Sequence, residues 1–81
     1  MTAEAIEKFT ESKEKAGQTV SIFFKQRSTI QGLFIQTNDY QEMKAKNFWR
    51  IVQAAKIAEW HQTKDLNLCR LFSGTDFMKI K

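Results

Sequence analysis

The alternation of hydrophobic and polar side chains predicts that most of this chain forms short β-strands. Over residues 20–25 every second side chain is apolar, at Val20, Ile22 and Phe24. Successive side chains of a strand point to opposite faces, so these three residues are expected to face a core together. Phe23 then points to the other face, which is an unusual position for a large aromatic side chain.

A second strand is expected soon after the first. Residues 26–28 are a polar connection of hairpin length, and residues 29–37 are predicted to form a longer strand. Gly32 interrupts this strand where a side chain would normally pack. A glycine inside a strand often marks a sharp bend or the close approach of another backbone. A long strand bent at glycine is what a small barrel needs to turn its corner.

Three more strands are predicted in the middle of the chain. Residues 40–46 alternate again, and residues 48–52 are rich in β-forming side chains. A tight turn at residues 53–55 then leads to a short fifth strand over residues 56–60. The alanines of this region leave a second reading, in which residues 50–62 form one helix. Strands are favoured because aromatic and β-branched residues are poor helix formers.

The two ends of the chain have different patterns. Residues 2–16 show helical spacing, with Thr2 as an N-cap, and Gly17 suits the end of that helix. At the other end, a polar link over residues 61–65 precedes two further strand-like runs. These runs are predicted to form a hairpin around Ser73 and Gly74. The expected fold is one mostly β domain with a leading helix.

Length and composition describe a small domain without disulfide or metal cross-links. The chain has 81 residues, near the lower limit for a self-supporting hydrophobic core. A single cysteine, Cys69, excludes an intrachain disulfide, and a single histidine, His61, leaves too few ligands for a tetrahedral zinc site. Stability is therefore expected to come from the ten aromatic side chains or from self-association. No metal or cofactor is predicted.

The charge balance is basic and the first helix is not. The net charge is +4 and the pI about 9.4. The first 19 residues are slightly acidic, so the basic excess lies in the rest of the chain. Such an excess is typical of nucleic-acid contact, although many small proteins reach it without that function. The acidic start, the single cysteine and the lack of a long apolar segment predict a cytoplasmic protein that does not enter membranes.

Catalysis is not expected. His61 and Cys69 are the only residues of their kinds, so neither a Ser/His/Asp nor a Cys/His set can be assembled at plausible spacing. Asp39 and Glu42 lie around a predicted turn and do not form a paired acid and base. The three glycines are far apart, so no glycine-rich loop can hold a phosphate.

Several segments resemble the Sm-like family, in its bacterial Hfq-like branch. VSIFFKQRSTIQG at residues 20–32 resembles the first two strands of that family, which begin with a Val-Ser-Ile-aromatic run and reach a Gln-Gly. NDY at residues 38–40 falls where the family has an aspartate close to an aromatic residue. KAKN at residues 44–47 falls where its third strand ends in Lys-Asn. In the second family motif, residues 52–55 read VQAA in place of Tyr-Lys-His-Ala.

The resemblance covers about residues 6–60 and implies both a fold and a function. The implied fold is a bent five-stranded Sm/SH3-like barrel over residues 20–60, which assembles into rings. The implied function is RNA binding in post-transcriptional regulation. The family's RNA-contacting Lys-His pair is replaced here, and Lys56 is the nearest base. Residues 61–81 have no counterpart in the family core and are expected to form an added hairpin that caps strand edges.

The residues themselves also favour binding of single-stranded RNA. Aromatic side chains on a strand surface stack on unpaired bases, and nearby Lys and Arg neutralise phosphates. Phe23 is predicted to face outward beside Lys25 and Arg27, and Tyr40 is predicted to form a second patch. The predicted RNA-contacting residues are Phe23, Lys25, Arg27, Gln31, Tyr40, Lys44, Lys46 and Lys56.

An alternative function is protein–protein interaction or oligomerisation without nucleic acid. Small barrels host many functions, and surplus aromatic residues can form a subunit interface. The residues predicted for such an interface, in a homo-oligomer or with another protein, are Phe48, Trp49, Ile51 and Trp60. The two functions differ in salt dependence, which is steep for RNA binding and weak for an aromatic interface.

Overall fold

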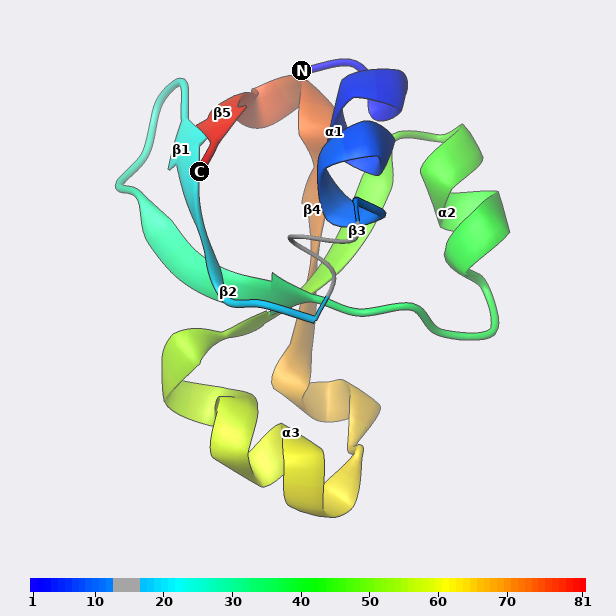
Figure 1. Cartoon of the computed structure of the whole chain (residues 1–81), viewed down its shortest axis with the longest axis vertical. Coiled ribbons are helices and arrows are strands. Elements are labelled where there is room, and N and C mark those ends of the chain that lie inside the picture. Colours follow the sequence, from blue (N-terminus) through cyan, green and yellow to red (C-terminus); the bar gives the residue numbers. More distant parts are fainter. Residues whose placement is uncertain (13–16) are drawn as a thin grey trace.

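A computed structural model describes residues 1–12 and 17–81 and shows one helix followed by a five-stranded antiparallel sheet (Figure 1). The order of the strands across the sheet is β4-β3-β2-β1-β5, so β4 and β5 are its two edges. In chain order the strands are β1 (Val20–Phe24), β2 (Ile30–Phe34), β3 (Phe48–Gln53), β4 (Cys69–Ser73) and β5 (Phe77–Ile80).

Helix α1 (Ala3–Thr10) begins at the predicted N-cap. The hydroxyl of Thr2 accepts a hydrogen bond from the backbone N–H of Ala5 at 3.2 Å. The helix ends at Thr10 with Glu11 as its C-cap, earlier than predicted, and residues 13–16 of the predicted helix lie outside the described residues. Ile6 is fully buried, so α1 packs on the sheet through its apolar stripe.

The first hairpin confirms the alternating pattern of β1, but β2 ends at Phe34 and is no longer than β1, so the longer strand predicted over residues 29–37 is wrong. Val20 pairs with Gly32 across β1 and β2, and the three residues predicted to face the core from β1 are buried. A Cβ atom on Gly32 would lie 2.6 Å from Cγ2 of Ile51 and 2.8 Å from the carbonyl oxygen of Val52. The close approach of β3 therefore requires glycine at this position, as the interrupted strand predicts.

Two groups of buried side chains lie on opposite faces of the sheet. The inner cluster packs beneath α1 and consists of Ile6, Val20, Ile22, Phe24, Trp49, Ile51, Phe72, Phe77 and Ile80. The outer cluster packs beneath helix α3 (Ile57–Thr63) and consists of Leu33, Ile35, Val52 and Trp60. Helix α3 covers the β2–β3 side of the outer face, whereas no helix among the described residues covers the outer face of β1 and β5 (Figure 1).

Residues 40–46 do not form the predicted strand. They form helix α2 (Tyr40–Ala45), because Gln, Glu, Met, Lys and Ala are good helix formers and a short alternating run also fits a helix. Helical spacing places the Nζ atom of Lys44 5.3 Å from the centroid of the Tyr40 ring. The helix is followed by Asn47 at φ 61°, whose side-chain oxygen accepts a hydrogen bond from the indole N–H of Trp49 at 2.7 Å.

The predicted fifth strand over residues 56–60 is also wrong. After β3, a 3-10 turn at Ala54–Lys56 leads directly into α3. A single helix over residues 50–62 is wrong as well, since β3 continues to Gln53. Ile57 and Trp60 stand three residues apart, so a helix presents both to the outer cluster, whereas a strand would have pointed them to opposite faces.

The C-terminal segment is part of the sheet and is not an added hairpin. Strand β4 pairs with β3, and β5 pairs with β1 at the opposite edge. Between them, the 3-10 turn Gly74–Asp76 carries the chain across the inner core, where a Cβ atom on Gly74 would lie 2.5 Å from Cδ1 of Ile6. A two-residue hairpin turn joins neighbouring strands and cannot connect strands at the two edges of the sheet. Residues 61–81 thus supply both edge strands.

Candidate nucleic-acid interface

Phe23 lies on the open outer face of β1. Its neighbours Ile22 and Phe24 point inward, and the Phe23 ring remains half-buried at the surface. Lys79 of β5 stands directly opposite in the strand register, with its Nζ atom 4.8 Å from the ring centroid. The Nζ atom of Lys81 lies 5.8 Å from the same ring. Two ammonium groups therefore flank one accessible aromatic ring.

Strand pairing holds these lysines in place. The backbone of Ser21 and that of Lys81 exchange two hydrogen bonds, of 2.9 and 2.8 Å. Gln31 is opposite Ser21 on β2 and is exposed on the same face. Lys25 continues the alternation of β1 beyond Phe23, and its N–H donates to the carbonyl oxygen of Asp76 at 3.0 Å. We call the surface formed by Phe23, Lys25, Lys79 and Lys81 the cationic face.

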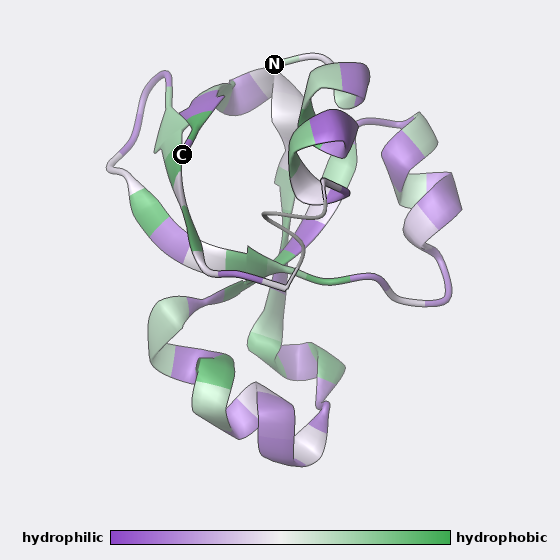
Figure 2. Ribbon diagram, viewed as in Figure 1, coloured by the Kyte–Doolittle hydropathy of each residue, from purple (hydrophilic) through white to green (hydrophobic). Residues whose placement is uncertain are grey.

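Arg27 lies beyond the cationic face, in the hydrophilic loop between β1 and β2 (Figure 2), and contacts rings of the inner cluster. The Cζ atom of its guanidinium group is 5.1 Å from the centroid of the Phe24 ring and 5.4 Å from that of Phe72. An open cavity of about 240 Å³ adjoins it. The cavity is lined by Phe24, Lys25, Gln26, Arg27 and Asp76.

The cations of this region differ from Lys44, Lys46 and Arg50 because no carboxylate of the described residues pairs with them. Within the part of the chain that the structure describes, no ion pair involves Lys25, Arg27, Lys79 or Lys81. Such cations are available to neutralise the charge of a phosphate backbone.

The predicted second patch around Tyr40 is occupied by contacts within the protein. The Tyr40 hydroxyl donates to Oε2 of Glu11 at 2.7 Å, and burial, followed by this hydrogen bond, raises the pKa of Tyr40. The Nζ atom of Lys44 lies 3.4 Å from a carboxylate oxygen of Glu7 and 3.8 Å from one of Glu11. These groups join α2 to α1, so the structure does not bring them to the cationic face.

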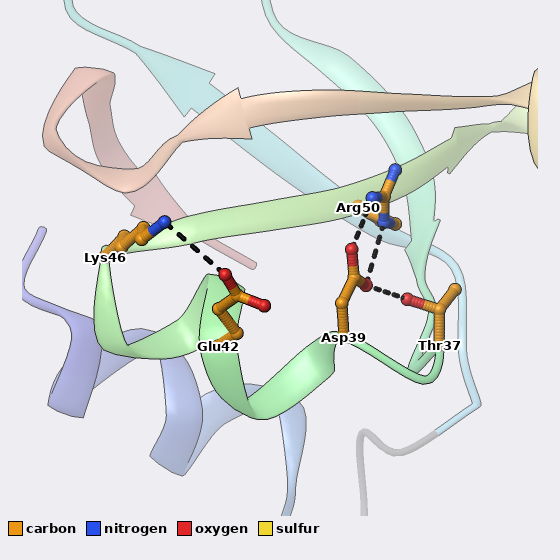
Figure 3. A network of polar contacts seen from close by, with 5 residues as sticks. All are labelled: Thr37, Asp39, Glu42, Lys46 and Arg50. Atoms are coloured by element: carbon orange, nitrogen blue, oxygen red, sulfur yellow. Dashed lines mark hydrogen bonds and ion pairs between the residues drawn. The ribbon is translucent and has the colours of Figure 1, made fainter.

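Lys46, the remaining residue of that predicted patch, belongs to the polar contacts drawn in Figure 3 along α2 and β3. Lys46 pairs with Glu42 at 3.6 Å. Asp39 accepts hydrogen bonds from Nη2 of Arg50 at 2.6 Å, from Nε of Arg50 at 3.3 Å and from the Thr37 hydroxyl. The hydrogen bonds from Arg50 and then Thr37 lower the pKa of Asp39 to about 2. Asp39 therefore fixes the start of α2 against β3.

The residues predicted for an oligomer interface lie mostly inside the chain. Trp49 is 2% exposed and Ile51 is fully buried, because both alternate toward the inner cluster on β3. Trp60 is buried beneath α3 in the outer cluster. Phe48 is half-buried on β3. Three of the four side chains are therefore used for folding and are not available to a partner in this structure.

One predicted residue lies away from the cationic face, and two lysines of that face were not predicted. Lys56 is exposed in the 3-10 turn before α3 and has no place on the cationic face. Lys79 and Lys81 were missed by sequence reasoning. Their signal was the alternation of residues 77–81, which puts both lysines on one face, but the pairing of β5 with β1 was not anticipated. In the described residues, no three His, Cys, Asp or Glu side chains are grouped to hold a metal ion.

Comparison of the chain with protein-family models, with curated proteins and with solved structures finds no match. None of the helices formed by the described residues is long and apolar enough to cross a membrane. The geometry of the cationic face is therefore the basis on which a function can be argued.

Proposed function

We propose that the cationic face binds single-stranded RNA without catalysing a reaction. The observation that carries this proposal is the Phe23 ring, which is half-buried on the sheet surface with two lysine ammonium groups over it. An unpaired base stacks on such a ring, and a stacking contact of this kind contributes about 1–3 kcal/mol per base. The lysines then meet the phosphates on either side of that base.

A strand surface of this kind suits single-stranded RNA better than a duplex. Paired bases are stacked inside a helix and cannot reach a side chain on a sheet surface, whereas unpaired bases can be splayed out. The exposed amide of Gln31 adds a donor and an acceptor for a base edge on the same face.

The proposal includes a finer description of the fold, a small barrel of the Sm-like kind. Its support is the strand order together with the packing of Phe24, whose ring centroid is 5.6 Å from that of Phe72 on β4 and 5.3 Å from that of Phe77 on β5. A single inward side chain of β1 thus contacts both edge strands, which requires the sheet to curl around its core.

Fluorescence anisotropy with uridine-rich and adenosine-rich oligomers tests the proposal. We expect Phe23→Ala to weaken binding by roughly five- to tenfold or more, from the loss of one stacked base. Lys64→Ala is the control. The Nζ atom of Lys64 lies over the Trp60 ring, 5.3 Å from its centroid, at the end of α3 and away from the cationic face. Equal affinities for all three folded proteins, or no binding by the wild type at low salt, would refute the proposal.

A second candidate function is self-association, and the free strand edges favour it. Strands β4 and β5 each pair on one side only, and they carry the exposed apolar side chains Leu71 and Met78. Unpaired edges are templates for another strand. Multi-angle light scattering across a range of protein concentrations would detect the oligomer. A constant monomer mass up to high concentration would exclude it.

A further inference from the structure

The cavity beside Arg27 lies within reach of a base that follows the one on Phe23. Lys25 follows the end of β1 directly, two residues after Phe23 in the sequence, and lines the cavity. Two residues of a strand span roughly 7 Å, which is close to the spacing between neighbouring nucleotides in an extended strand. At about 240 Å³ the cavity is smaller than a typical drug-sized pocket and suits one nucleobase.

The lining of the cavity combines a planar group, on which a base can stack, with hydrogen-bond donors and an acceptor for the edge of that base. The Arg27 guanidinium is planar and is held against the Phe24 and Phe72 rings, so it offers a stacking surface. Lys25 and the amide of Gln26 offer hydrogen-bond donors. Asp76 offers a carboxylate, which only accepts; no salt bridge within the described residues involves it, and its charge acts on the N-terminal ammonium group of Met1.

An unpaired carboxylate is a poor neighbour for a phosphate and a good one for guanine. The Watson–Crick edge of guanine presents, in order, the O6 acceptor, the N1–H donor and the N2 amino donor. A carboxylate accepts both donors at once, and an adjacent ammonium or amide donates to O6. Adenine, cytosine and uracil each place a ring nitrogen or carbonyl acceptor next to their single donor group, and that acceptor is repelled by the carboxylate.

We propose that this cavity recognises an unpaired guanine, stacked on Arg27 and read by Asp76 and Lys25, next to the base on Phe23. The proposal rests on the RNA binding proposed above and adds a base preference to it.

The test compares short oligouridines of equal length with and without one central guanosine, by anisotropy with the wild-type protein. A single guanine keeps the strand from forming quadruplexes. We expect the guanosine to tighten binding by about five- to tenfold. Inosine, which lacks the N2 amino group, should lose part of this gain, whereas 7-deazaguanosine, whose Watson–Crick edge is intact, should keep it.

Asp76→Asn tests the residue. Its backbone carbonyl still accepts from Lys25, so the fold is expected to persist. The preference for guanosine should disappear, while binding of oligouridine stays equal or becomes tighter. Glu59→Gln, an equal change of charge on the exposed surface of α3, should leave the preference unchanged. Equal binding of both oligomers by the wild type would overturn the guanine site and leave RNA binding intact. A wild type that binds neither oligomer would overturn both.

Discussion

At the scale of single residues, the basic side chains of the described residues divide into those that pair with a carboxylate and those that do not. Lys44, Lys46 and Arg50 belong to the first group: Lys44 joins α2 to α1, Arg50 joins its start to β3, and Lys46 pairs with Glu42 of α2 itself. Exposed ion pairs contribute little to stability individually, but they determine which cations remain free for a ligand. The residue types in the sequence are the same in both groups, so only the three-dimensional positions of the acidic residues separate them.

The Asp39–Arg50 pair predicts a specific dependence of stability on pH. Because the pKa of Asp39 falls from the ordinary 3.8 to about 2 in the folded protein, the unfolded chain binds the proton more readily. The stabilisation is complete above the unfolded pKa and is lost as the pH falls from about 4 to about 2. We therefore expect Asp39→Asn to lower the free energy of unfolding at pH 7, measured in urea, and this deficit to shrink across that acid range.

Glu59→Gln is the control for the acid range, because Glu59 is exposed on α3 and forms no ion pair with the described residues. Its free energy of unfolding should follow that of the wild type at every pH. A deficit of Asp39→Asn that stays constant from pH 7 to pH 2 would show that the pair does not depend on the charge of Asp39.

At the scale of elements, the sequence was informative where two faces differ and ambiguous where they do not. The alternation in β1 predicted both the strand and the outward position of Phe23. The alternation at residues 40–46 misled, since both faces of that segment are largely polar and its residues favour helix. The pairing partners of β4 and β5 could not be read from local pattern, because they depend on how the Gly74–Asp76 turn crosses the core.

Helix α3 is predicted to be a separate unit of stability. It is packed through the outer cluster, while β1 and β5 belong to the inner cluster. Trp60→Ala should cost about 3 kcal/mol, at the lower end for a large aromatic residue, because the cluster is small. Hydrogen exchange should accelerate in residues 57–63 and remain slow in β1. Glu59→Ala, on the exposed side of the same helix, should change neither. Equal acceleration in β1 and α3 would show that the two clusters unfold together.

At the scale of the whole molecule, helices α1 and α3 leave one region of the sheet surface uncovered. Helix α1 lies over the inner core and α3 over the outer face of β2 and β3, so the cationic face is the uncovered part of the outer face (Figure 1). The net charge of +4 is thus not spread evenly. Cations near α2 are paired with acidic residues, whereas no ion pair within the described ranges involves a cation of the cationic face.

This uneven distribution predicts the salt dependence of RNA binding. If the strand meets three cations of the face, the logarithm of the affinity should fall with the logarithm of salt concentration with a slope of about −2, at about −0.7 per phosphate contact. Replacing both Lys79 and Lys81 by alanine should make the slope shallower by about 1.4 and weaken binding for every base sequence. Lys46→Ala, which removes a cation already paired with Glu42, should leave the slope unchanged. If Lys46→Ala lowered the slope as much as a lysine of the cationic face does, RNA would be bound by net charge alone, and the position of Phe23 would have no part in it.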